Sequence, residues 1–179
     1  MSVLLAPNVA NTQDTATYRT LMQASASHIA AKIAGTYGLG CGDPAAVGGT
    51  GTLYPLSLMY IAAADYPTVG SLAPKLRIRA QVNCNDVAPT GNFTVGLYPV
   101  TRPATSGGAG LNIYTIGTVV TGSDGATVTT PAADSQTSMV GADFALPADG
   151  FYIMAVVTTA TVATSSHVHI NAQLQIHNV

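Results

Sequence analysis

The residues of this chain best suited to chemistry are two histidines separated by one residue, in the run His167-Val168-His169. Side chains two positions apart on a strand leave the same face of the sheet. Imidazole nitrogens are common transition-metal ligands, and three copies of such a pair around a three-fold axis could surround one ion. A polar face in contact with water explains the spacing more simply. We therefore expect no bound metal and keep His167 and His169 as the candidate ligands.

Other reactive side chains form no recognisable catalytic set. Nucleophilic catalysis needs Ser, Thr or Cys beside a base, but the chain has only four histidines and no Gly-x-Ser-x-Gly segment. Glutamate is absent, and most of the eight aspartates fall in expected turns, where Asx hydrogen bonding explains them. The sequence therefore predicts that the protein is not an enzyme and carries no catalytic residue and no cofactor.

Half of the six basic side chains lie in one alternating run, as Lys75, Arg77 and Arg79. On a strand these three share a face, which makes the row a candidate interface with an acidic partner or a neighbouring copy. A solvated strand face, or aliphatic stems covering apolar surface, is the alternative interpretation. Six basic residues are too few for extensive phosphate neutralisation, so we expect no nucleic-acid partner.

Charge is scarce throughout the chain. Charged residues make up 8% of the 179 residues and hydrophobic residues 47%, whereas soluble domains average roughly 25% charged residues. No apolar run approaches the ~18–20 residues that span a bilayer, so we expect no membrane insertion. A surface this poor in charge favours association, and we expect a homo-oligomer. Cys41 and Cys84 are too few for a disulfide framework; free thiols are expected, with a bridge left open.

Most of the sequence indicates short strands. The runs 75–84 and 167–177 alternate apolar and polar residues throughout, as expected for strands with one buried face. Further runs at 53–63, 92–100, 111–120, 126–130, 137–146 and 151–159 are separated by turn-forming segments. This pattern predicts a mainly β fold: an antiparallel, jelly-roll-like β-sandwich of about eight strands.

The N-terminal segment has a different pattern. Leu21, Met22, Ile29 and Ile33 are spaced near one helical face, which predicts a helix over 15–34 after an extended arm and before a glycine-rich linker. We therefore divide the chain into residues 1–51 and a sandwich domain, residues 52–179. These four apolar residues are candidate interface residues. The helix is also a candidate cover for Phe151–Val157, which is apolar on both faces; a subunit contact is the alternative.

Four segments carry a resemblance to a known family: 60–67, 75–82, 92–100 and 172–179. They resemble small virion proteins of tailed phages that infect actinobacteria, often labelled minor tail proteins. The resemblance implies a non-enzymatic structural component of the virion, made in the host cytoplasm. It would assemble with itself, as a homotrimer in our interpretation, and with other phage head or tail proteins. Placement on the tail or as a capsid decoration stays open.

A binding module is the alternative function. The exposed loops of a sandwich could bind a host-surface glycan, although this rests on analogy of fold. The chain has no tryptophan, so an aromatic platform for sugar would use tyrosine or phenylalanine. Tyr37, Tyr98 and Tyr114 are the candidates.

Overall fold

The computed structural model describes residues 18–26, 45–47, 51–85, 91–101, 115–129, 132–158 and 167–178. These residues form eleven strands and two short 3-10 helices, η1 (Ala63–Asp65) and η2 (Ser123–Gly125). The strands are β1 (Arg19–Ala26), β2 (Ala45–Val47), β3 (Gly51–Ile61), β4 (Pro74–Asn85), β5 (Asn92–Thr101), β6 (Thr115–Ile116), β7 (Ala126–Thr129), β8 (Ser135–Val140), β9 (Phe144–Ala145), β10 (Gly150–Thr158) and β11 (His167–Asn178).

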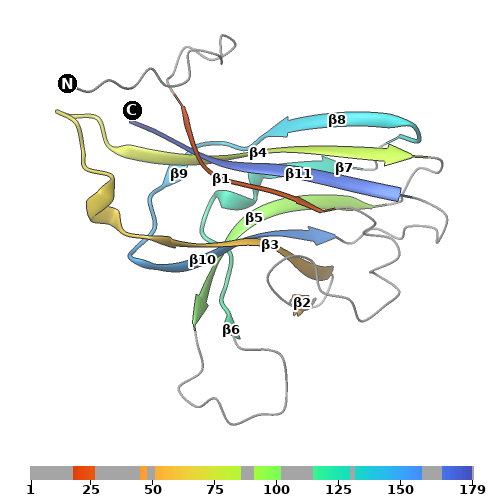
Figure 1. Cartoon of the computed structure of the whole chain (residues 1–179), viewed down its shortest axis with the longest axis horizontal. Helices are drawn as coiled ribbons and strands as arrows, with labels where there is room; N and C mark the ends of the chain where they lie inside the picture. The colour runs from red at the N-terminus through yellow and green to blue at the C-terminus, as the bar shows by residue number, and fades with distance from the viewer. Residues whose placement is uncertain are drawn as a thin grey trace.

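The strands form two antiparallel sheets (Figure 1). The first sheet has the order β1-β11-β4-β8, with β9 also paired to β4; the second has the order β2-β3-β10-β5-β6, with β7 also paired to β5. When β2 is set aside and the pairs β6/β7 and β8/β9 each count as one interrupted strand, eight strands remain. Their order is first-eighth-third-sixth and second-seventh-fourth-fifth, which is the order of a jelly roll. The predicted antiparallel sandwich is confirmed.

The core lies between the inner faces of the two sheets. Because side chains alternate along a strand, every second residue of β4 and β11 points inward, as the sequence pattern predicted. The inward residues of β5 and β10 meet them from the second sheet. The largest fully buried side chains in this core include Leu76, Ile78, Val82, Phe93, Leu97, Met154, Ile170 and Leu174.

The predicted N-terminal helix is wrong where the structure describes it, because Arg19–Ala26 is strand β1, paired with β11. The register shifts between Thr20 and Met22, so Leu21 is an extra residue in the strand. Such a bulge places two apolar residues in succession, which breaks the period of two and imitates a helical face.

This strand corrects part of the interface prediction. Met22 is buried in the core between the sheets, and Leu21 packs against that core, so neither forms a free helical surface. Ile29 and Ile33 lie outside the described residues. Both β1 and β2 precede residue 51, so the two sheets include parts of the segment that the sequence assigned to arm, helix and linker.

Strand β10 is apolar on both faces because it lies at the centre of the second sheet, between β3 and β5. Its inward residues enter the main core, while Ile153 and Ala155 on the outer face are also buried. Ile116 and Val119 pack against this outer cluster. Residues of the same chain therefore cover this part of the strand. The segment predicted as a helix does not form this cover, because its described part is strand β1, which belongs to the opposite sheet.

Residues 117–120 lie against β5, to which they form backbone hydrogen bonds. The amide of Gly117 donates to the carbonyl of Pro99 at 2.8 Å, and the amide of Val120 donates to Leu97 at 2.8 Å. A Cβ on Gly117 would lie 2.9 Å from Cγ of Pro99, so a larger residue there would force a shift. Glycine thus permits this segment to lie against the edge of the second sheet.

Two further sequence predictions concern cysteine and the membrane. Cys84 is a free thiol buried on the inner face of β4, and burial raises the pKa of that thiol. Cys41 lies outside the described residues. Within the described ranges there is no helix long and apolar enough to cross a membrane.

Candidate functional site

The outer face of the first sheet carries rows of polar side chains on β4 and β11. Strands β4 and β11 pair without a register shift, which places Lys75 opposite His177, Arg77 opposite Gln175 and Arg79 opposite Gln173. The alternation read from the sequence therefore brings the basic row of β4 beside a row of amides and imidazoles on β11. What each basic residue can do depends on its immediate surroundings.

Arg77 is not an exposed interface residue. Only 6% of it is accessible, and its guanidinium carbon lies 3.2 Å from the centroid of the Tyr18 ring. Its Nε donates to Oε1 of Gln175 at 3.0 Å. A guanidinium over an aromatic face is a favourable cation–π arrangement, so Arg77 fastens the residue before β1 to the sheet. Lys75 and Arg79 remain partly exposed.

Next to Arg77 lies a polar cluster in which Tyr18 and His177 are buried and the carboxylate of Asp143 is at the surface. The Tyr18 hydroxyl donates to Oδ1 of Asp143 at 3.2 Å, and Nε2 of His177 lies 2.9 Å from Oδ2 of the same carboxylate. The rings of Tyr18 and His177 have centroids 4.0 Å apart. His177 is 5% accessible although the sequence placed it on the wet face. The cluster joins the end of β11 to the segments before β1 and β9.

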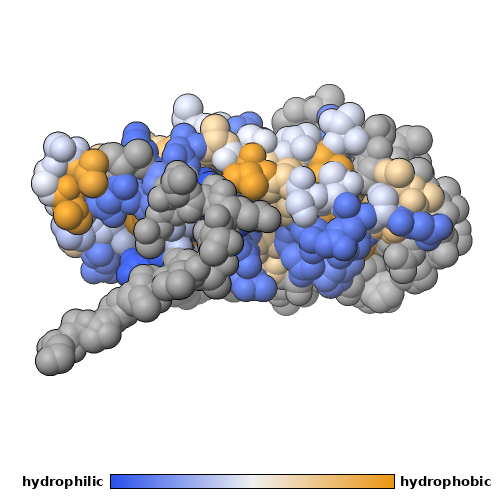
Figure 2. Space-filling model, turned by 90° about the horizontal axis from the view of Figure 1, so that it is seen from above, coloured by the Kyte–Doolittle hydropathy of each residue, from blue (hydrophilic) through white to orange (hydrophobic). Residues whose placement is uncertain are grey.

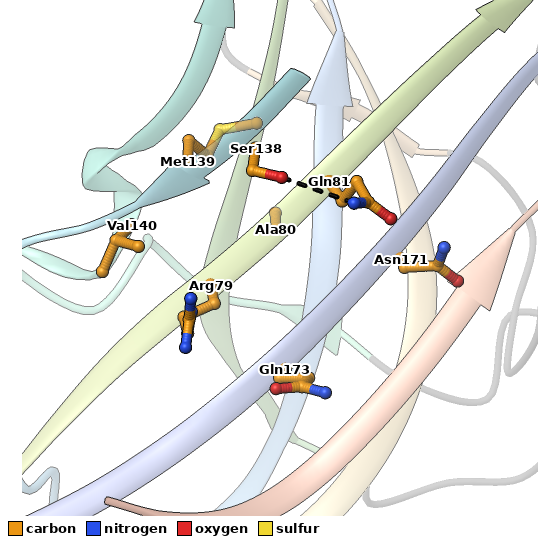
Figure 3. Close-up of a pocket in the computed structure, with 8 residues that line it drawn as sticks. All are labelled: Arg79, Ala80, Gln81, Ser138, Met139, Val140, Asn171 and Gln173. Atoms are coloured by element: carbon orange, nitrogen blue, oxygen red, sulfur yellow. Dashed lines mark hydrogen bonds between the residues drawn. The ribbon is translucent and has the colours of Figure 1, made fainter. Parts of the chain in front are cut away.

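A shallow depression lies further along the same face, over β8, β4 and β11 (Figure 3). Its volume is about 270 Å³. Ala80 and Met139 contribute to its wall, and the side chains drawn around it come from three adjacent strands: Arg79 and Gln81 from β4, Ser138 and Val140 from β8, and Asn171 and Gln173 from β11. The sequence alone gave no sign of this depression, because it depends on β8 lying beside β4.

The depression is rich in groups that can both donate and accept hydrogen bonds. Nε2 of Gln81 donates to Oγ of Ser138 at 3.4 Å, and Nε2 of Gln173 donates to Oε1 of Gln23 at 3.5 Å. These distances are long for hydrogen bonds. Among the described residues that line the depression, Arg79 is the only charged one. The arrangement suits an anionic, hydroxyl-rich ligand.

The histidine pair gains no support as a metal site. The ring Nε2 of His169 lies 3.2 Å from Oδ1 of Asn171, a neighbour on the same strand. Nothing is described of the His167 side chain. In the described part of the chain, no group of three His, Cys, Asp or Glu residues could hold a metal ion. A shared site formed by several copies stays a prediction.

The outer face of the second sheet carries an exposed aromatic pair that sequence reasoning missed. Tyr60 on β3 and Phe151 on β10 are directly opposite in the register and are 52% and 53% exposed. Their ring centroids are 4.9 Å apart in an edge-to-face arrangement. The apolar character of Phe151–Val157 was the available signal, but only the strand pairing identifies Tyr60 as the partner.

Of the three tyrosines considered as sugar platforms, Tyr98 is excluded because it is 5% accessible. Burial, and then the negative charge of Asp124, raise the pKa of Tyr98 to about 12. Tyr37 and Tyr114 lie outside the described residues. On the face that Figure 2 shows, hydrophobic residues form small separate patches among hydrophilic ones.

Comparison of the chain with protein-family models, with curated proteins and with solved structures found no match. The resemblance to small tailed-phage virion proteins therefore stays a prediction from the sequence motifs.

Proposed function

We propose that this chain is a non-enzymatic structural component of a tailed-phage virion, on the tail or as a capsid decoration. The jelly-roll strand order supports the proposal, because this architecture is common in viral capsid proteins as well as in lectin domains. The charged fraction of 8% supports it too, since a free-standing protein of this size ordinarily carries far more charge.

The exposed pair of Tyr60 and Phe151 carries the proposal. Both rings are about half exposed although they lie at the border of an otherwise buried apolar cluster. Aromatic residues are enriched at the centres of protein interfaces, where partners bury them. We propose that a second copy of the chain, or a neighbouring virion protein, covers the pair in a homotrimeric assembly.

Light scattering during size-exclusion chromatography tests this function. The purified chain should have the mass of a trimer, and Phe151→Ser should shift the mass towards the monomer while the unfolding transition is kept. Thr127→Ala, which changes an exposed position on β7, is the matched control and should leave the mass unchanged. A monodisperse monomer that also fails to bind purified particles would contradict the proposal.

A second candidate function is recognition of a glycan on the host surface. The polar depression over β8, β4 and β11 favours it, because amides and a hydroxyl converge there from three strands. A glycan array probed with the full chain tests this function. Binding that survives Gln173→Ala and Gln81→Ala would place the glycan elsewhere on the molecule.

A further inference from the structure

We propose that the depression around Arg79 binds a saccharide that carries a carboxylate, such as a hexuronate unit. The inference deepens the glycan-binding candidate by naming its ligand class, and it leaves the structural role untouched. Three independent features support it: the charge of the depression, the chemistry of its side chains and its size.

Charge selects an anion. The guanidinium of Arg79 makes no hydrogen bond or ion pair with any residue that the structure describes. Arg77, two residues earlier on the same strand, is instead buried against Tyr18 and Gln175. The planar fork of arginine donates two parallel hydrogen bonds to a carboxylate, which a neutral sugar cannot accept with equal strength.

The remaining side chains suit the hydroxyls of a sugar ring. Gln81, Asn171 and Gln173 each offer an amide that both donates and accepts, and Ser138 offers a hydroxyl. Gln81 is bonded to Ser138 at 3.4 Å, and Gln173 is bonded to Gln23 and Gln175, outside the depression, at 3.5 and 3.4 Å. Ligand hydroxyls can replace such long bonds at small cost. Val140, which is 49% exposed, gives an apolar contact for the C–H face of the ring.

Size favours a saccharide over an acidic protein segment. A volume of about 270 Å³ lies just below the roughly 300–1,000 Å³ of pockets that hold drug-sized ligands, which is suited to one sugar ring with part of its neighbour. Among the described residues that line the depression, Val140 is the one large hydrophobic residue that is exposed, whereas the centre of a protein interface usually carries several apolar and aromatic anchors. Protein binding is therefore an outcome that the test must separate.

The probe is tetragalacturonic acid, and its methyl ester is the matched ligand without charge. Both are titrated into the full chain by isothermal calorimetry and by following amide shifts of β4, β8 and β11. The acid should bind at least about tenfold more tightly than the ester, because only the ionised carboxylate can accept charge-assisted hydrogen bonds from the guanidinium of Arg79. Arg79→Gln should remove this difference.

Lys75→Gln is the matched protein control. It removes the same charge from the same face of β4, but Lys75 does not line the depression. Affinity for the acid should stay within about twofold in this variant if Arg79 acts by direct contact. Equal losses in Lys75→Gln and Arg79→Gln would overturn the proposal, because only the general positive field of the face would then be responsible.

Other outcomes also decide the matter. Equal affinity for acid and ester, or amide shifts outside the three strands, would overturn the inference. If neither saccharide binds at millimolar concentration while Arg79→Gln abolishes binding to purified particles, Arg79 contacts protein and the inference fails. The trimer mass and the particle binding are measured on the same variants. If the unsubstituted chain is a monomer that binds no particles, the structural function alone fails, because binding of the two saccharides is measured independently of both readouts.

Discussion

The outer face of the second sheet packs apolar residues under a layer of its own chain, whereas the outer face of the first sheet carries polar residues that hold each other in pairs. On the second sheet, Ile153 and Ala155 are 3% and 0% exposed although they point away from the main core. On the first sheet, Arg77 and His177 are as deeply buried, through contacts with Tyr18 and neighbouring polar groups.

The difference shows that burial on this molecule is achieved in two ways. Apolar residues lose water by packing, which requires no particular partner geometry. Burial of a polar group costs free energy unless a hydrogen bond replaces its bond to water, as it does for Nε2 of His177 but not for Nδ1, which has no partner among the described residues. Each face then leaves one region open: the aromatic pair of Tyr60 and Phe151 on the second sheet and the depression around Arg79 on the first. The open regions are the places where we expect partners to bind.

Substitution on the covered apolar face should have the largest effect on the free energy of unfolding. Ile153→Ala removes a fully packed side chain and should lower the free energy of unfolding by about 2–5 kcal/mol. Gln173→Ala, at a partly exposed position on the opposite outer face, should change it by at most about 0.5 kcal/mol. Urea unfolding of both variants measures the contrast. Similar values for the two would mean that the outer apolar cluster contributes no packing energy.

The polar cluster should show an intermediate effect. Asp143→Ala removes the carboxylate that contacts the Tyr18 hydroxyl and Nε2 of His177. Leaving a buried polar group without its partner costs about 1–3 kcal/mol, so unfolding should become easier by that amount. Asp65→Ala, in the exposed helix η1, is the control and should stay within about 0.5 kcal/mol. If the two substitutions have equal effects, the cluster does not hold the sheet together.

The same contrast explains how much could be predicted from the sequence. Strands β4 and β11 were predictable because their period of two is unbroken, and β10 because its residues form a continuous apolar run. Strand β1 was not, because the bulge at Leu21 interrupts the alternation. Of the site, only the row of basic residues on β4 was predictable. The burial of Arg77 by Tyr18 and the pairing of β8 with β4 were not, because they depend on contacts between residues far apart in the chain.

Substitution of the exposed aromatic pair should have a smaller effect on the free energy of unfolding. Tyr60 and Phe151 contact each other in the isolated chain, so a double-mutant cycle with Tyr60→Ala and Phe151→Ala should give a coupling energy of about 0.5–1.5 kcal/mol. The cycle is measured by urea unfolding at a protein concentration low enough to give monomer. A coupling of zero would show that the pair gains its order only from a partner that covers it.

The last prediction is a dependence of stability on pH at Tyr98, on the covered face, which has no effect near neutral pH. Burial and the charge of Asp124 raise the pKa of this phenol from 10.0 to about 12, so the folded chain holds the proton more tightly than the unfolded chain. Stability is therefore unaffected by this group below pH 10 and falls as the pH rises from 10 towards 12. Tyr152, whose pKa is raised by burial and by Asp149, acts in the same direction, so part of the fall in stability remains when Tyr98 is replaced.

Tyr98→Phe should make the fall in melting temperature between pH 10 and pH 12 shallower. Tyr60→Phe, at an exposed tyrosine of the same sheet, is the control. An unchanged slope in Tyr98→Phe would mean that water reaches the hydroxyl of Tyr98 in the folded state and that the cover over this face is open there.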